Sequence, residues 1–133
     1  MLGEKVGEET GKVSVRRVLP NDGFPKLEVS FQSSGKLLGV EHRNMCTYTA
    51  TLAGDGITHG EGLGIATGRN GEIAKWKGHG AGRLKGDGSV SYRGMVQYET
   101  QSEVWKRLNG IALAFEYEVD AEGNTRTAYW EWK

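Results

Sequence analysis

The chain has one cysteine, two prolines and no net charge, and each of these scarcities excludes a class of protein. Cys46 is the only cysteine among the 133 residues, so no disulfide can form within the chain and nothing in the composition calls for secretion. Seventeen Lys and Arg residues balance 17 Asp and Glu residues. The chain therefore lacks the positive excess typical of nucleic-acid-binding proteins, and we expect no nucleic-acid partner.

Long apolar runs are also missing. The first 12 residues are polar and contain Glu4, Glu8 and Glu9, which is unlike a signal peptide or a membrane span. We therefore expect a cytoplasmic protein with no membrane partner. Residues 1–11 are predicted to form a flexible N-terminal tail, and residues 12–133 a single domain large enough to bury a core.

Proline is scarce whereas glycine is abundant, with 21 residues. Low-complexity chains are usually rich in both, so these glycines are expected at turns and strand bends. Four Trp, five Tyr and three Phe residues supply bulky side chains for a core. The composition thus favours a folded, glycine-bent β-structure over a flexible chain.

Glycine alternates with other residues in two neighbouring segments, and this is the most informative pattern in the chain. The segments are Gly60-Glu61-Gly62-Leu63-Gly64 and Gly78-His79-Gly80-Ala81-Gly82, with Asn70-Gly71 between them. Because successive side chains of a strand point to opposite faces, the glycines of each segment share one face. Asn-Gly between alternating segments is a strong signal of a β-hairpin. The face without side chains leaves room for bulky neighbours or for a ligand, and it allows sharp bending.

Strand signals recur along the whole chain and are separated by turn residues. They cover residues 13–18, 27–31, 37–41, 45–52, 57–66, 73–84, 90–99, 111–119 and 125–132. Strands joined by short turns are typical of an antiparallel sandwich or barrel. A meander of about eight strands can close on itself and so remove its exposed edges. The predicted fold is all-β, a single antiparallel β-barrel of roughly eight strands, closed by pairing of the last strand with the first.

One segment departs from the strand pattern. Residues 102–109 read as a short helix, because Ser102 is a favourable N-cap and Gly110 suits the position after the last turn. Glu103 in the first turn and Lys106 in the last complement the helix dipole. The helix is expected to plug one end of the barrel.

The register of the central hairpin decides which side chains point inward, since a slip of one residue inverts every orientation. A two-residue turn at Asn70-Gly71 would place Ile65 opposite Trp76 and Glu61 opposite Gly80. Large residues would then face glycines, which is sterically complementary.

The register of the next hairpin supports the same interior face. A three-residue turn at residues 86–88 would place Trp76 opposite Tyr98, on the same face as Ile65, while Lys75 and Lys77 would lie on the opposite face. We take the apolar face as the interior. An eight-stranded barrel can be filled by its side chains or can hold one small ligand. The predicted ligand-binding residues are Tyr48, Leu63, Trp76, Tyr92, Val96, Tyr98, Phe115 and Trp130.

The same register turns Glu61 and His59 toward the interior, and they are the candidate catalytic residues. An interior carboxylate must be hydrogen-bonded, protonated or close to water, and such a group can act as a general acid or base. Two plainer interpretations remain open. Glu61 lies near the barrel mouth and is solvated, or the register slips and Glu61 lies outside.

The sequence offers no metal or cofactor site. His42, His59 and His79 show no His-x-His or Cys-His spacing, so no zinc site is predicted. Cys46 is expected to be a small buried apolar residue. The alternating glycines lack the helix that follows a dinucleotide-binding loop, so no nucleotide cofactor is expected.

The second half of the chain resembles the allene oxide cyclase-like barrels, a lipocalin-like group of small bacterial proteins that mostly have no known function. The resemblance covers roughly residues 26–133. It is carried by residues 78–82, Tyr92-Arg93-Gly94, the run from Arg107 to Asp120, Gly123-Asn124 and the terminal Trp130-Glu131-Trp132-Lys133. It implies a calycin-like barrel. The plant cyclases convert an unstable fatty-acid epoxide inside the barrel with a carboxylate and ordered water, and related barrels cyclise polyketides. Glu61 is an analogue of that carboxylate by role alone.

Three functions follow as hypotheses. The first is binding of a small apolar molecule inside the barrel. The second is a cofactor-independent cyclase or isomerase that moves a proton with an interior carboxylate on a lipid-like or polyketide-like substrate. The third is a filled barrel that acts through its outer surface, for example as a homo-oligomer. One fold can host many activities, so the three hypotheses have to be distinguished by the residues of the functional site.

Overall fold

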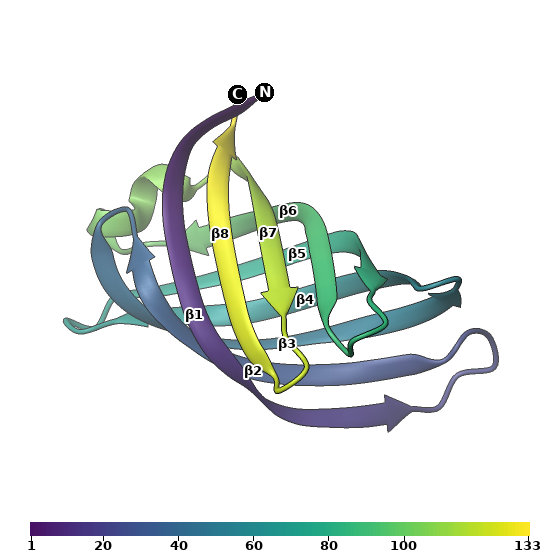
Figure 1. Cartoon of the computed structure of the whole chain (residues 1–133). Coiled ribbons are helices and arrows are strands. Elements are labelled where there is room, and N and C mark those ends of the chain that lie inside the picture. Colours follow the sequence, from purple (N-terminus) through teal and green to yellow (C-terminus); the bar gives the residue numbers. More distant parts are fainter.

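A computed structural model describes residues 1–133 as a closed antiparallel β-barrel of eight strands (Figure 1). The strands are β1 (Leu2–Leu19), β2 (Lys26–Leu37), β3 (Val40–Gly54), β4 (Ile57–Gly68), β5 (Ile73–Leu84), β6 (Val90–Thr100), β7 (Ala112–Val119) and β8 (Asn124–Trp132). Each strand pairs with the next, and β8 pairs with β1. The predicted all-β, eight-stranded barrel is confirmed. The strand predicted over residues 37–41 is interrupted by the turn at Leu38-Gly39, where both residues have positive φ.

The prediction of a flexible tail over residues 1–11 is wrong, because this segment closes the barrel. Between Leu2 and Lys12, β1 pairs with β8, and from Gly7 onward it also pairs with β2. Val6 and Glu9 are buried. The segment looks like a tail in the sequence because its inward positions hold glycines and a glutamate instead of large apolar residues. The two chain ends consequently lie side by side (Figure 1), and the amino group of Met1 donates to the carbonyl of Lys133 at 2.9 Å.

The hairpin of β4 and β5 has a three-residue loop instead of the predicted two-residue turn. The backbone amide of Gly68 donates to the carbonyl of Glu72, and Gly71 has a φ of 86°. A three-residue loop that ends in a left-handed glycine is a common hairpin connection. It shifts the pairing by one residue, so Ile65 lies opposite Lys75 and Glu61 opposite His79. Every side chain of β4 therefore points to the face opposite the predicted one.

The register predicted between β5 and β6 is confirmed. Trp76 lies opposite Tyr98, Gly78 opposite Val96 and Gly82 opposite Tyr92. The interior faces of these two strands are therefore as expected. The glycines of β4 join them inside the barrel, whereas the larger residues of β4 lie outside.

The inward glycines of β4 make room for aromatic rings. A Cβ atom at Gly64 would lie 2.5 Å from the indole of Trp76, and one at Gly62 would lie 3.1 Å from Cβ of Tyr48. The indole of Trp76 thus lies directly against the backbone of β4. The alternating glycines leave space inside the barrel. Bulky neighbouring side chains occupy most of that space.

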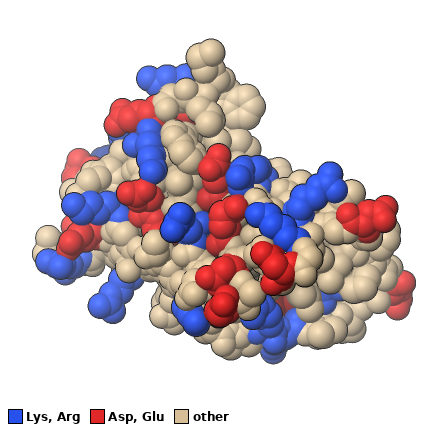
Figure 2. Space-filling view, viewed as in Figure 1, with Lys and Arg blue, Asp and Glu red and all other residues tan.

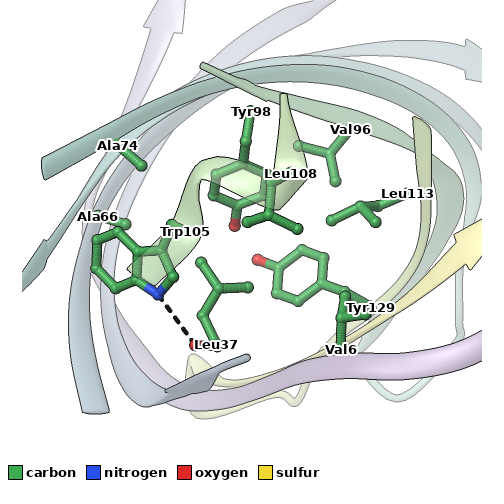
Figure 3. Packing of buried hydrophobic residues seen from close by; sticks show 10 residues of the cluster. All are labelled: Val6, Leu37, Ala66, Ala74, Val96, Tyr98, Trp105, Leu108, Leu113 and Tyr129. Carbon is green, nitrogen blue, oxygen red and sulfur yellow. Dashed lines mark hydrogen bonds between the residues drawn. The ribbon is translucent and has the colours of Figure 1, made fainter. Parts of the chain in front are cut away.

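A short 3-10 helix, η1 (Glu103–Leu108), covers one end of the barrel as predicted. Trp105 and Leu108 are fully buried there, and the indole nitrogen of Trp105 donates to the carbonyl oxygen of Leu37 at 3.0 Å (Figure 3). Ser102 precedes the helix without capping it through its side chain. Its hydroxyl instead accepts from the backbone amide of Ile73 at 3.0 Å, which ties the helix to the start of β5.

The exterior is polar and mixed in charge. Figure 2 shows Lys and Arg side chains interspersed with Asp and Glu over the face that it presents. Exposed ion pairs join Arg93 to Glu116 and Glu118, and a partly buried pair joins Arg107 to Glu131. The structure contains no helix with the length and apolar character that a membrane-spanning helix requires.

Trp105 is expected to stabilise the barrel by closing its end. Trp105→Ala should lower the free energy of unfolding by about 3–5 kcal/mol, because it removes a fully buried ring and leaves a cavity. Trp105→Phe should cost less, since it keeps most of the packing and loses the hydrogen bond to Leu37. Urea unfolding followed by circular dichroism measures both. A loss below about 1 kcal/mol for the alanine variant would contradict this role of η1.

Candidate functional site

A cavity of about 60 Å³ lies inside the barrel between the aromatic side chains and the glycine-rich wall. A single buried water needs roughly 10–15 Å³, so the cavity has room for several waters or for a compact molecule of a few heavy atoms. Its lining comes from seven of the eight strands and consists of Phe31, Tyr48, Gly60, Gly62, Trp76, Gly78, His79, Gly80, Tyr92, Val96, Phe115, Tyr117, Thr127 and Tyr129.

The cavity has one polar group with no partner. Thr127 on β8 is 4% exposed, and its hydroxyl makes no hydrogen bond. A buried hydroxyl is expected to find a partner, and leaving it without one costs roughly 1–3 kcal/mol. The Thr127 hydroxyl is therefore a polar group without a partner in the wall of an aromatic and glycine-lined cavity.

The tyrosine hydroxyls around the cavity are already engaged with each other or with neighbours. The hydroxyl of Tyr117 donates to that of Tyr48 at 3.4 Å, and the hydroxyls of Tyr92 and Thr58 lie 2.9 Å apart. Burial raises the pKa of Tyr48 to about 12 and also raises the pKa of Tyr92 and Tyr117. These groups stay neutral near pH 7 and offer hydrogen bonds, without serving as bases.

The structure brings together most of the residues predicted to bind a ligand. Tyr48, Trp76, Tyr92, Val96 and Phe115 all line the cavity. These residues come from β3, β5, β6 and β7. The register between β5 and β6, which agrees with the prediction, places Trp76, Tyr92 and Val96 on the inner face.

The other three predicted ligand-binding residues lie elsewhere. Tyr98 is buried in the neighbouring cluster beneath η1 (Figure 3). Leu63 points outward and is 64% exposed, because the longer loop inverts β4. Trp130 also faces outward, since Tyr129 is its inward neighbour on β8, and the ammonium of Lys5 lies 5.9 Å from the centre of its ring.

The two candidate catalytic residues are on the outside of the barrel. Glu61 and His59 are both exposed, and across β5 they lie opposite His79 and Ala81. Neither lines the cavity. The one-residue shift of β4 is the cause, and it corresponds to the alternative in which the register slips.

A different carboxylate is buried inside the barrel. Glu9 on β1 is 2% exposed and accepts four hydrogen bonds. One oxygen accepts from Ser33 at 2.8 Å and from Tyr129 at 3.2 Å. The other lies 2.7 Å from Nε2 of His42 and accepts from the amide of Asn44 at 2.9 Å. All four acceptor positions of the carboxylate are therefore in use.

The absence of a side chain at Gly35 makes this cluster possible. Gly35 on β2 pairs with Glu9 on β1 and with His42 on β3, so the two polar side chains are separated by one intervening strand. They meet over the bare backbone of Gly35. A Cβ there would collide with the backbone of Glu8 and Glu9.

The cluster around Glu9 holds two residues of the cavity wall. The indole nitrogen of Trp76 donates to the side-chain oxygen of Asn44 at 2.9 Å, and Asn44 donates in turn to Glu9. Tyr129 donates to Glu9 directly. Glu9 does not border the cavity and has no free acceptor position, so it fits the role of a positioning group better than that of a general base.

The sequence carried one usable signal for this cluster. Ser33, His42 and Asn44 are polar residues at alternate positions that share a face with Phe31 and Cys46. Polar residues on an apolar face need a buried partner. The partner itself was missed because Glu9 lies among other charged residues.

The described chain has no group of three or more His, Cys, Asp or Glu side chains placed to hold a metal ion. His42 is inside the barrel, whereas His59 and His79 are outside.

Comparisons with known proteins support the fold. No protein-family model and no curated protein matches the chain. Among solved structures, a protein with unknown function from Clostridium acetobutylicum is similar, with a TM-score of 0.82, 12% identity and 98% of each chain covered.

Two further crystal structures give the same result. A conserved protein of unknown function from Rhodopseudomonas palustris has a TM-score of 0.82 at 9% identity, with 99% of each chain covered. A beta-barrel like protein from Acinetobacter baumannii has a TM-score of 0.80 at 10% identity, with 97% of this chain and 94% of that chain covered. At these identities the similarity establishes a shared barrel fold and no activity.

Glu9→Gln is expected to destabilise the barrel by about 3–5 kcal/mol, as is typical when one partner of a buried charged cluster is removed. The amide nitrogen of glutamine is a donor. Facing Asn44 it would meet another donor, and facing Ser33 and Tyr129 it would require both hydroxyls to reverse their hydrogen bonds. Glu8→Gln is the matched control, because Glu8 is exposed and its ion pair with Lys5 should contribute little. Equal midpoints of urea unfolding for the two variants would contradict the prediction.

The five tyrosines should make the fold sensitive to alkali. Burial raises the pKa of all five, which are Tyr48, Tyr92, Tyr98, Tyr117 and Tyr129. Above pH ~10 the unfolded chain loses phenolic protons that the folded state keeps, so stability falls as the pH rises, by up to about 1.4 kcal/mol per pH unit for each tyrosine.

Absorbance near 295 nm and circular dichroism, followed together from neutral to alkaline pH, measure this effect. Phenolate should appear only as the fold is lost. Ionisation of tyrosines near pH 10 in an intact barrel would contradict it.

Proposed function

We propose that the protein binds a small, largely apolar molecule that carries one hydroxyl or carbonyl oxygen inside the barrel. The observation that supports this most directly is the unpartnered hydroxyl of Thr127, a residue in the wall of an aromatic cavity. A ligand oxygen placed beside Thr127 would restore the missing hydrogen bond. The rest of the ligand would contact the rings of Trp76 and Phe115 and the backbone at Gly78 and Gly80.

The size of the cavity limits the ligand. Sites for drug-sized molecules are typically about 300–1,000 Å³, several times larger than this cavity. A long lipid or a polyketide would require several aromatic side chains to move. Among the classes implied by an allene oxide cyclase-like barrel, binding of a compact molecule is therefore favoured over the cyclase reaction.

The position of the carboxylates also favours binding over catalysis. A cyclase or isomerase of the kind considered needs a carboxylate beside its substrate. Glu61 is outside the barrel, and Glu9 is fully hydrogen-bonded away from the cavity. We further propose that the barrel is of the allene oxide cyclase-like group and that the protein works in the cytoplasm, where the buried thiol of Cys46 stays reduced.

The proposal predicts saturable binding of small oxygenated probes. Titration of the ¹⁵N-labelled protein with 2-butanol, cyclopentanol and phenol should shift the backbone amide resonances of Gly62, Gly78 and Gly80, with the largest response for the probe that best fills the cavity. Thr127→Val should weaken that binding about five- to tenfold, the equivalent of one neutral hydrogen bond.

Thr125→Val is the matched control. Thr125 is on the same strand, is equally buried and also has an unpartnered hydroxyl, but it does not line the cavity. Its replacement should leave probe binding unchanged. The absence of saturable shifts with all three probes would overturn the proposal, and equal losses in the two variants would show that Thr127 does not contact the ligand.

A further inference from the structure

Asparagine followed by glycine occurs twice in the chain, at Asn70-Gly71 and at Asn109-Gly110. Glycine has no side chain to crowd its backbone nitrogen, so in such a pair this nitrogen can attack the side-chain amide of the asparagine with little hindrance. Both pairs are exposed, and the two glycines have positive φ, 86° and 76°. Neither glycine nitrogen makes a hydrogen bond. The two pairs are therefore matched in sequence, exposure and glycine conformation.

The two pairs differ in the hydrogen bonds of the asparagine side chain. The side-chain oxygen of Asn109 accepts from the backbone amide of Thr100 at 2.9 Å, and its side-chain nitrogen donates to the carbonyl of Thr100 at 2.8 Å. The side chain of Asn70 makes no hydrogen bond, whereas its backbone amide donates to the carboxylate of Glu72. The side chains of the other three asparagines are also bonded, Asn21 to Phe24, Asn44 to Glu9 and Asn124 to Asp120.

We propose that Asn70 is a site of spontaneous deamidation, and that the folded barrel confines this modification to Asn70 because it holds the side chain of Asn109 in place. The co-reactant is water from the solvent. This inference does not depend on ligand binding in the cavity.

The reaction proceeds through a cyclic imide. The backbone amide of Gly71 loses its proton to solvent hydroxide, and its nitrogen attacks Cγ of Asn70. The bond between this nitrogen and Cγ forms, the bond between Cγ and Nδ2 breaks, and the amide group takes up a proton from water and leaves as ammonia. Water then opens the ring at either of its two carbonyl carbons, which leaves aspartate or isoaspartate at residue 70.

The loop between β4 and β5 leaves both reacting groups accessible. Asn70 and Gly71 lie outside the two strands and are exposed. The loop is closed by the hydrogen bond from the amide of Gly68 to the carbonyl of Glu72 at 3.0 Å, which does not involve the nitrogen of Gly71. An exposed amide without a hydrogen bond loses its proton to hydroxide more readily than an amide in a strand.

The same attack at Asn109 is hindered by its two hydrogen bonds. Both tie its side chain to the backbone of Thr100 at the end of β6, so the side-chain amide cannot turn toward the nitrogen of Gly110 until they break. Two neutral hydrogen bonds lower the population of the free side chain roughly ten- to hundredfold. We therefore expect the deamidation of Asn109 to be slower than that of Asn70 by this factor.

The modification changes the charge of one corner of the barrel. Glu72 is in the same loop, and Glu41 pairs with Arg69 beside it at 2.7 Å. The new carboxylate at residue 70 is ionised at neutral pH, so the formal net charge of the chain falls from zero to minus one. The modified protein can therefore be separated from the unmodified protein by anion exchange.

Storage of the folded protein in mildly alkaline buffer tests the proposal. Peptide mapping after pepsin digestion at acid pH, which limits deamidation during the digestion, measures the mass gain at each asparagine. Modified Asn70 should accumulate about ten- to hundredfold faster than modified Asn109. Asn70→Ser is the control variant and should remove the acidic form from the anion-exchange profile. Equal rates at the two sites, or no modification of Asn70 while the unfolded chain is modified there, would overturn the proposal.

The unfolded chain separates the effect of the structure from that of the sequence. In guanidinium chloride the hydrogen bonds between Asn109 and Thr100 are lost, so Asn70 and Asn109 should be modified at similar rates. The same preference for Asn70 in the unfolded chain would show that the flanking sequence causes the selectivity, and it would overturn the protective role assigned to these hydrogen bonds.

Discussion

The hydrogen bonds of the Glu9 carboxylate hold the closure of this barrel in place. Its partners come from β2, β3 and β8, so one side chain on β1 is bonded to the strands on both sides of β1. A buried charge is unfavourable unless its acceptor positions are filled, and here all four are. The same requirement fixes the position of β1 along its neighbours, since a shift by one residue would turn Glu9 outward and leave Ser33, His42 and Asn44 without their acceptor. The end of the chain that looks least like a core in the sequence is therefore fixed in register by a buried side chain.

The fold class could be predicted from the sequence because strand alternation and turn residues are local signals. The register of β5 and β6 could also be predicted, because Trp76, Val96 and Tyr92 form a consistent apolar face. The register of β4 could not, because it depends on whether Arg69 joins the turn with Asn70 and Gly71. That choice decides the face of Glu61, His59 and Leu63, and the Asn-Gly pair by itself favours the two-residue turn. The buried carboxylate was missed for another reason, since Glu9 gains its partners from strands distant in the sequence.

The interior divides into a packed end, a cavity and an aromatic end. Beneath η1, Trp105 and Leu108 complete a dense cluster with Tyr98 and Leu37. A second cluster around Phe31 and Tyr117 fills the opposite end. Trp76 and Phe115 pack against both clusters, and the cavity lies beside them. Seven aromatic residues border the open volume, and one of them, Trp76, is held by Asn44. The Glu9 cluster and the cavity are thus parts of one arrangement, connected through Trp76 and Tyr129.

The contact between Gly64 and Trp76 has a consequence for how this sequence can vary. The indole occupies the volume that a side chain at residue 64 would need, so the two positions share a single volume across adjacent strands. Neither residue can change in size alone without a clash or a void. We would expect homologous chains to alter the two positions jointly, with a smaller residue at 76 wherever 64 is larger. Such paired substitutions would show that the two positions are in contact in homologous barrels, even where the overall sequence identity is too low to show a common structure.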